Sequence, residues 1–167
     1  MLRFRSWLSL LLLPIMMFVA SCISVSLPES KTIRSEKATF NAPPAPYAES
    51  KEPQLDAYWS NSKNGNSISV LSDCSKNSDP SLLTITKGII GGIEEAKIVS
   101  SQESLYNHRA ALRSLIDGRV DGVPTKVKLT VFKKNGCIYI LTYVALEKHF
   151  SSDELIFSNF ELEFKVP

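Results

Sequence analysis

The clearest pattern of hydrophobic and polar positions lies in the second half of the chain. Residues 126–131 alternate between Lys or Thr and an aliphatic side chain, which is typical of a strand with one buried face. Residues 138–145 are mostly apolar or aromatic at both parities, and this predicts a central strand covered on both sides. Lys134-Asn135-Gly136 lies between them and is a hairpin signal, so the two segments are predicted to pair antiparallel.

The segment ahead of this pair fits two periodicities. Residues 105–116 fit a helix, whereas Leu112, Ile116 and Val120 suit one face of a strand. The hairpin signal Asp121-Gly122 favours the strand, because the long strand that follows needs a partner. We therefore expect a three-stranded meander joined by Asp-Gly and Asn-Gly turns.

Shorter strands are predicted earlier in the chain. Tyr58-Trp59 and residues 67–71 alternate and are separated by the turn-rich stretch 61–66, which predicts a hairpin. Residues 96–100 predict one more short strand.

Helices are predicted on either side of the meander. Asp79-Pro80 offers an N-cap and a first-turn proline for an amphipathic helix that stops at Gly91-Gly92. Ser151 and Glu154 form a capping-box pattern that opens a second helix. Residues 161–166 alternate and predict a closing strand. The residues expected to face inward are Leu155, Ile156 and Phe160 in the helix and Leu162, Phe164 and Val166 in the strand. The fold class expected is α+β, a mainly antiparallel sheet with flanking helices.

The chain divides into three parts by composition. Residues 1–21 read as a signal peptide and residues 54–167 as one globular domain. Residues 22–53 are rich in Ser, Lys, Glu and Pro and lack periodicity, which predicts a disordered, flexible linker.

The first 22 residues carry a targeting pattern. Arg3 and Arg5 precede an apolar run, and Val-Ala-Ser stands directly before Cys22. This order resembles the lipobox of bacterial lipoproteins. The resemblance implies cleavage before Cys22, fatty acids such as palmitate on its thiol, and acylation of the new amine, so that the mature protein is anchored to a membrane.

Two other interpretations of Cys22 remain at this point: the last residue of a transmembrane anchor, or part of an ordinary secretory signal. The run is short for a membrane span. Among lipoproteins of two-membrane bacteria, Asp after the modified Cys favours the inner membrane. Ile23 stands there instead, so we expect a cell-envelope protein at the outer membrane, reaching into the periplasm or outside.

The order of predicted elements resembles a known fold. The segment from Ala110 to Phe164 is similar to the PsbP-like α/β sandwich, and in particular to small bacterial lipoproteins built on it. The residues that carry the resemblance are 121–124 (Asp-Gly-Val-Pro), 133–139 (Lys-Lys-Asn-Gly-Cys-Ile-Tyr), Phe157, Phe160 and Phe164. They occupy turn and core positions, so the resemblance implies a fold and no catalytic residues.

Charge excludes one class of partner. The 19 Lys and Arg fall to 17 without Arg3 and Arg5, which equals the 17 Asp and Glu. A neutral mature chain without a Lys/Arg-rich stretch offers nucleic acid no electrostatic footprint.

Cys74 and Cys137 are the two thiols left beside Cys22. Export to an oxidising compartment favours a disulfide between them. Two buried free thiols or a redox-active pair are the alternatives, the latter without a Cys-x-x-Cys motif.

The remaining reactive side chains match no known site. His108 and His149 have no zinc spacing, and no Gly-x-Ser-x-Gly elbow exists for a serine nucleophile. The Tyr58-Trp59 pair suggests either a stacking platform or core. The charges Arg113, Asp117, Arg119 and Asp121 suggest either a binding face or a solvated surface. We expect no catalytic residues, no metal and no cofactor, and the sequence identifies no ligand-binding residues.

These observations favour a non-catalytic, membrane-anchored envelope lipoprotein that binds or organises another envelope protein. A carrier for a small apolar ligand is the alternative, and a hydrolase stands behind it.

Overall fold

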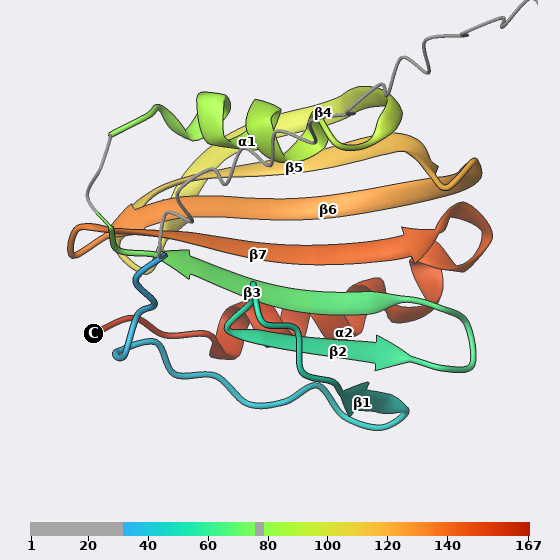
Figure 1. Cartoon of the computed structure of the whole chain (residues 1–167), viewed down its shortest axis with the longest axis horizontal. Coiled ribbons are helices and arrows are strands. Elements are labelled where there is room, and N and C mark those ends of the chain that lie inside the picture. Colours follow the sequence, from blue (N-terminus) through green and yellow to red (C-terminus); the bar gives the residue numbers. More distant parts are fainter. Residues whose placement is uncertain (1–31, 76–78) are drawn as a thin grey trace, which may run out of the picture. The chain divides into compact units, whose positions relative to one another are not determined.

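The predicted meander forms the centre of a single seven-stranded antiparallel sheet (Figure 1). The structure is a computed structural model that describes residues 32–75 and 79–167. The strand order is β1-β2-β3-β7-β6-β5-β4. The strands are β1 (Tyr47–Glu49), β2 (Ala57–Asn61), β3 (Ser67–Asp73), β4 (Glu94–Tyr106), β5 (Arg109–Val120), β6 (Val123–Lys134) and β7 (Cys137–Leu146). The helices are α1 (Leu82–Ile90), the 3-10 turn η1 (Glu147–His149) and α2 (Phe150–Glu163).

Two tight turns fix the register of the meander. Asp121 and Gly122 both have positive φ, 50° and 73°, and so do Asn135 and Gly136, 55° and 78°. A two-residue turn of this kind matches the twist of its flanking strands, and Asn-Gly and Asp-Gly supply it at little steric cost. The strand reading of residues 109–120 is therefore confirmed, and the helical alternative is wrong.

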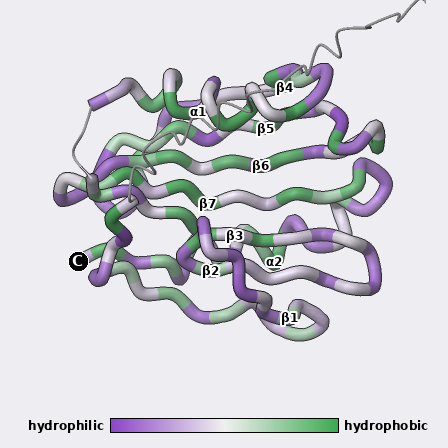
Figure 2. Tube along the Cα trace, in the orientation of Figure 1, coloured by the Kyte–Doolittle hydropathy of each residue, from purple (hydrophilic) through white to green (hydrophobic). Residues whose placement is uncertain are grey.

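Each face of the sheet carries its own core, because successive strand residues point to opposite sides. On one face, aliphatic residues of β5, β6 and β7 pack under α1. On the other face, a mainly aromatic core packs against α2, which passes behind β3 and β2 in Figure 1. Figure 2 shows hydrophobic positions along the middle of the central strands and hydrophilic ones at the turns. This arrangement is the expected α+β fold.

Helix α1 begins later than the sequence suggests. Its N-cap is Ser81, whose hydroxyl accepts a hydrogen bond from the Thr84 amide at 3.1 Å. The predicted cap, Asp79, instead forms an ion pair with Lys133. The predicted stop is confirmed, since Gly91 is the C-cap.

Helix α2 corrects three further predictions. The capping box does not form, because η1 already turns the chain and places Ser151 and Glu154 inside the helix, which has no side-chain cap. The closing strand at 161–166 is also wrong. The helix continues through Glu163, and Leu162 is 71% exposed, whereas Phe164 and Val166 are buried as expected. Leu155, expected to face inward, is 72% exposed on the outer side of the helix.

The predicted strand at 96–100 is part of a much longer one. β4 spans 13 residues at the edge of the sheet, and its side chains are mostly exposed. An exposed strand shows no alternation of polar and apolar residues, so the pattern understated its length.

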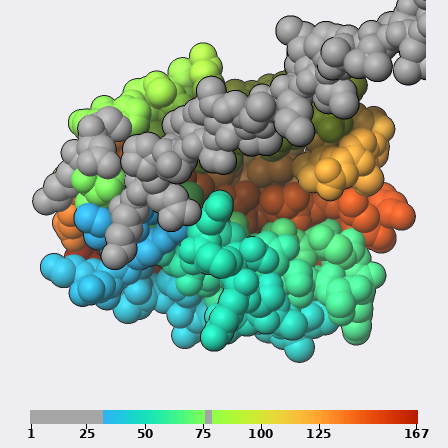
Figure 3. Space-filling view, viewed as in Figure 1, coloured from blue at the N-terminus to red at the C-terminus, as the bar shows by residue number. Residues whose placement is uncertain are grey.

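The predicted linker is folded over much of its length. We call residues 32–46 the strap. Within the strap, Thr39 forms a β-bridge with Lys165, and Phe40 packs on the aromatic core. Tyr47 then starts β1, which pairs with β2. In Figure 3 the blue and cyan atoms of the strap lie against the teal atoms of β1 and β2. The predicted domain start at residue 54 is therefore wrong, and the domain includes residue 32. Residues 1–31, including Cys22, lie outside the described residues.

In the part of the chain that the structure describes, no helix combines the length and the apolar character needed to cross a membrane.

Candidate functional site at the disulfide end

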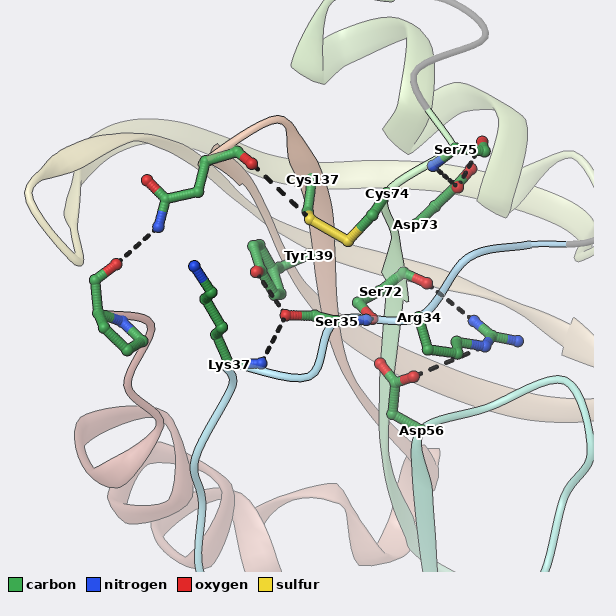
Figure 4. Close-up of a disulfide and its surroundings, with 12 residues drawn as sticks. Arg34, Ser35, Lys37, Asp56, Ser72, Asp73, Cys74, Ser75, Cys137 and Tyr139 are labelled. Carbon is green, nitrogen blue, oxygen red and sulfur yellow. Dashed lines mark hydrogen bonds and ion pairs between the residues drawn. A yellow bond between two sulfur atoms is a disulfide. The ribbon is translucent and has the colours of Figure 1, made fainter.

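Cys74 and Cys137 form a disulfide between the end of β3 and the start of β7 (Figure 4). The register of the two strands pairs Asp73 with Ile138, so the cysteines occupy the next opposed position. This is the pairing favoured by the sequence, and the free-thiol alternative does not apply to these two sulfurs. We call this end of the sheet, where β3 ends and β7 begins, the disulfide end.

The strap is hydrogen-bonded to β3 beside the disulfide. The Cys74 amide donates to the carbonyl of Ile33 at 2.8 Å, and the Ser35 amide donates to the hydroxyl of Ser72 at 2.7 Å. The Ser35 hydroxyl lies 2.8 Å from that of Tyr139 on β7. The strap therefore leaves the sheet at a fixed point.

Arg34 joins three segments at this point. Its guanidinium donates to the carbonyls of Ser72, at 2.9 Å, and of Gln54, and its Nε lies 3.6 Å from a carboxylate oxygen of Asp56. Burial raises the pKa of Asp56, while the hydrogen bond from Ser72 and the charge of Arg34 oppose that rise. Arg34 thus clasps the strap to β3 and to the loop before β2.

A cleft of about 360 Å³ opens next to Arg34 and Asp56. Its polar lining residues are Arg34, Asp56 and Ser35, and the rest of its lining is apolar. The guanidinium already faces a carboxylate and two carbonyls, and the Ser35 hydroxyl already faces a phenol. The polar groups that line the cleft are therefore paired with one another or with neighbouring segments of the chain. The lining residues are Arg34, Ser35, Ala38, Phe40, Pro53, Leu55 and Asp56.

A second polar cluster lies at the opposite end of the sheet, around Asp153 on α2. One carboxylate oxygen accepts hydrogen bonds from the side chains of Tyr47, Asn61, Asn64 and Asn66, at 2.9 to 3.0 Å. Burial opposes ionisation of this carboxyl, but the four hydrogen bonds outweigh it and hold the pKa of Asp153 below its usual range. The cluster ties α2 to β1 and to the β2–β3 turn.

Sequence reasoning missed this cluster. Asn61, Asn64 and Asn66 are ordinary turn residues by sequence, and Asp153 stands far away in the chain. A run of asparagines beside strands that end near a helix start is the only signal for it, and it does not name its carboxylate partner.

The charged residues singled out from the sequence are spread over β5 and its turn. Asp117 pairs with Lys126 at 2.8 Å, and the Nε of Arg113 lies 3.6 Å from Glu161. Arg119 donates to the carbonyl of Gly122 within its own turn. These contacts are separate from one another. Asp117, Arg119 and Asp121 are partly or fully exposed, as the solvated-surface interpretation expects, whereas Arg113 reaches the buried Glu161 and lies over the Tyr106 ring.

Tyr58 and Trp59 do not share a face of the sheet, and His108 and His149 do not belong to any group that could hold a metal ion in the described residues. Trp59 is buried between Phe40 and Phe160, whereas Tyr58 points to the other side of the sheet. Trp59 therefore belongs to the core and the pair makes no stacking platform. Across residues 32–75 and 79–167, no three His, Cys, Asp or Glu side chains are grouped so that they could hold a metal ion.

Comparison with known proteins informs the fold. No protein-family model matches the sequence, and a search of curated proteins gave no match. Solved structures are similar in shape at low identity. Cyanobacterial PsbP (CyanoP) from Synechocystis sp. PCC 6803 has a TM-score of 0.55 at 12% identity, with 78% of this chain and 87% of that chain covered.

Two other solved structures share the architecture. LpqN, which is involved in cell envelope biogenesis of Mycobacterium tuberculosis, has a TM-score of 0.57 at 9% identity, with 78% of this chain and 83% of that chain covered. PA94 from Pseudomonas aeruginosa, a protein of unknown function described as a putative regulator, has a TM-score of 0.52 at 12% identity, with 84% and 88% covered. The fold is therefore PsbP-like, as the sequence resemblance implied.

Proposed function

We propose that this chain is an exported, lipid-anchored envelope protein whose domain binds another envelope component and performs no chemistry. The observation that carries the proposal is the disulfide between Cys74 and Cys137. Such bonds persist in oxidising compartments and are rare in the cytosol. It supports export, which is what the signal pattern before Cys22 predicts.

The fold of the domain also supports a location in the cell envelope. LpqN shares the fold and is itself involved in cell envelope biogenesis. Similarity at 9% identity extends to architecture alone, so the envelope role of this chain rests on the signal pattern, with the neighbour as a parallel.

The pairing of the polar groups supports a binding role. At the disulfide end, Arg34 and Asp56 neutralise each other, and Ser35 is paired with Tyr139. At the other end, one carboxylate oxygen of Asp153 accepts four hydrogen bonds. In both places the polar groups fasten segments of the chain together, and this structural role favours a domain that performs no chemistry.

The proposal includes a lipid anchor at Cys22. Cys22 is the first residue of the mature protein, it carries fatty acids including palmitate, and Ile23 directs the protein to the outer membrane. The test is the mass of the N-terminal peptide from the membrane fraction, measured for the parent, Cys22→Ser and the control Ser24→Ala. The parent and Ser24→Ala peptides should begin at Cys22 and carry acyl chains. A Cys22→Ser protein that matures and partitions with membranes as the parent does would overturn the anchor.

Binding of another envelope protein has its own test. A photocrosslinking amino acid at Leu155 on α2, or at Leu105 on β4, samples two different surfaces through side chains that are 72% and 81% exposed. In living cells that make the full chain, one of these positions should give a reproducible crosslinked protein that disappears in the Cys22→Ser background. Absence of any crosslinked protein at both positions contradicts an interaction role.

A further inference from the structure

We propose that the free edge of β4 pairs with the same edge of a second copy of this chain, so that two sheets join into one. The second copy is a further partner beside the envelope component of the proposed function, and this pairing does not depend on the lipid anchor.

The two edges of the sheet differ in how they are protected. At one edge, β1 has only three residues, and a short edge strand offers little to pair with. At the other edge, β4 has 13 residues, and within the described part of the chain its partner is β5 alone (Figure 1). A long exposed edge strand presents a row of backbone donors and acceptors that can pair with another chain.

The features that block such pairing lie in the first half of β4. Two register shifts against β5 fall within residues 94–100. The same half carries most of the charges of the strand, and both bulges and charges discourage pairing at an edge. Residues 100–106 keep a regular register with β5, and Glu103 is the charged residue among them. The second half of β4 is therefore open to a partner.

The turn after β4 decides which backbone groups point outward. Residues 107 and 108 form a two-residue turn with positive φ, 49° and 62°, and Tyr106 lies opposite Arg109. The residues that flank such a turn form a hydrogen-bonded pair, and bonded and non-bonded pairs then alternate along the strands. The residues whose amides and carbonyls point away from β5 are Ser101, Glu103 and Leu105.

Antiparallel pairing with a second copy places complementary side chains opposite each other. A two-fold axis at Gln102 brings Ser101 of one copy opposite Glu103 of the other, where the hydroxyl can donate to the carboxylate. The same axis brings Leu105 opposite Val99. Leu105 and Val99 are the exposed large hydrophobic residues of β4, at 81% and 49%, and this register covers both.

The neighbouring registers match less well. They are the ones that also keep the outward backbone groups of the two copies facing each other. A two-fold axis at Glu103 places two like charges directly opposite each other, which is destabilising. An axis at Ser101 places Leu105 opposite Lys97, so an apolar and a charged side chain are left unmatched. The sequence of β4 therefore favours the register centred on Gln102.

The test places a cysteine on this two-fold axis. Opposed residues of a non-hydrogen-bonded antiparallel pair have Cα atoms about 4.5 Å apart, a distance that a disulfide can span. Cells that make the full-length Gln102→Cys chain are treated with diamide, a thiol oxidant that crosses membranes, and the chain is analysed on a non-reducing gel. We expect most of the Gln102→Cys chain to run as a disulfide-linked dimer.

Two controls are treated in the same way. Ser100→Cys is exposed on the same face of β4, but its counterpart lies about 13 Å further along the strand, which is beyond the reach of a disulfide. The parent chain reports on its own three cysteines. Both should remain monomeric. Absence of the dimer at position 102, or equal dimer formation by either control, overturns the proposal, and a link to a different protein overturns the second copy as the occupant.

The apolar pair supplies a second measurement. In the Gln102→Cys chain, Leu105→Asp places a charge opposite Val99 and should reduce the dimer band severalfold. Leu155→Asp is the matched control, because Leu155 is 72% exposed on α2, and it should leave the band unchanged. Both leucines are exposed, so neither change should disturb the fold. A dimer band that Leu105→Asp leaves at full strength contradicts pairing through β4.

Discussion

Phe40 lies flat against Phe164, with ring centroids 5.6 Å apart and ring planes 6° from parallel. One residue belongs to the strap that precedes the sheet, and the other follows α2 near the end of the chain. Trp59 meets the Phe40 ring edge-on at 5.8 Å. The strap is therefore part of the aromatic core.

Replacing the Phe40 ring should cost much of the domain's stability. Phe40→Ala removes contacts with Trp59, Phe160 and Phe164, and we expect the free energy of unfolding to fall by about 3 kcal/mol. Urea denaturation followed by tryptophan fluorescence measures the change. Ile33→Ala, at an exposed strap position, is the control and should stay within about 0.5 kcal/mol of the parent. Equal effects of the two variants would mean that the strap does not belong to the core.

A fragment that starts at residue 54 tests the domain boundary. It lacks the strap and β1, so Trp59 and Phe160 lose their cover and Asp153 loses the Tyr47 hydroxyl. We expect residues 32–167 to unfold cooperatively and residues 54–167 to show a broadened or absent transition in urea. Identical transitions for the two fragments would restore the boundary that composition suggests.

Ionised Asp153 should make stability depend on pH. Its pKa is lowered in the folded protein, so its contribution is present above the ordinary value of 3.8 and is lost as the pH falls through the folded value. Asp153→Asn should lower the free energy of unfolding by about 1–3 kcal/mol at pH 7, and the difference from the parent should shrink below about pH 4.

Unfolding in urea between pH 3 and pH 7 measures this dependence. Asp121→Asn is the control, because Asp121 is exposed in a turn, and its difference from the parent should be small at every pH. A constant difference for Asp153→Asn across the range would show that the hydrogen bonds, and not the charge, carry the stabilisation.

Breaking the disulfide should weaken the fold without removing it. Cys74 and Cys137 are 63 residues apart in sequence. A loop of this length restricts the unfolded chain by roughly 4 kcal/mol in the chain-entropy model. The Cys74→Ser, Cys137→Ser double variant should lose about that much in urea denaturation, and a reducing agent should lower the parent to the same value. A reducing agent that leaves the parent unchanged contradicts the bond.

Two glycines should respond to alanine with opposite signs. A Cβ on Gly118 in β5 would clash with the Cγ2 of Ile93 and lie 3.0 Å from the Glu94 carbonyl oxygen, so Gly118→Ala should destabilise by about 1–3 kcal/mol. Gly88 lies inside α1 with nothing within 4 Å of the added atom. Gly88→Ala should stabilise by about 0.5–1 kcal/mol, because alanine is the better helix former. Thermal unfolding of both variants checks the pair.

The meander was predictable because its signals are local. Asp121-Gly122 and Asn135-Gly136 specify their turns through residues that tolerate positive φ, whatever the rest of the chain does. Once the turns are placed, the alternation in 126–131 fixes which side chains of β6 face each core. The opposition of Cys74 and Cys137 depends on a different register, that of β3 against β7, which pairs Asp73 with Ile138.

The strap and the Asp153 cluster were not predictable in this way. Phe40 and Tyr47 are isolated apolar residues in a Pro-rich, polar stretch, and their partners belong to β2 and α2. The prediction for the end of α2 failed for a related reason. Phe164 and Val166 are buried at a spacing that suits a strand, although Leu162 lies in the last turn of the helix and is exposed. Long-range contacts decide each case, and the sequence carries no local sign of them.

The pairing of Thr39 with Lys165 affects how this protein is made. Because the two ends of the domain meet, the aromatic layer between them cannot close until residues 164 and 165 have left the ribosome. The strap must therefore wait for more than 120 later residues to be made before its ring finds a partner at the far end of the domain.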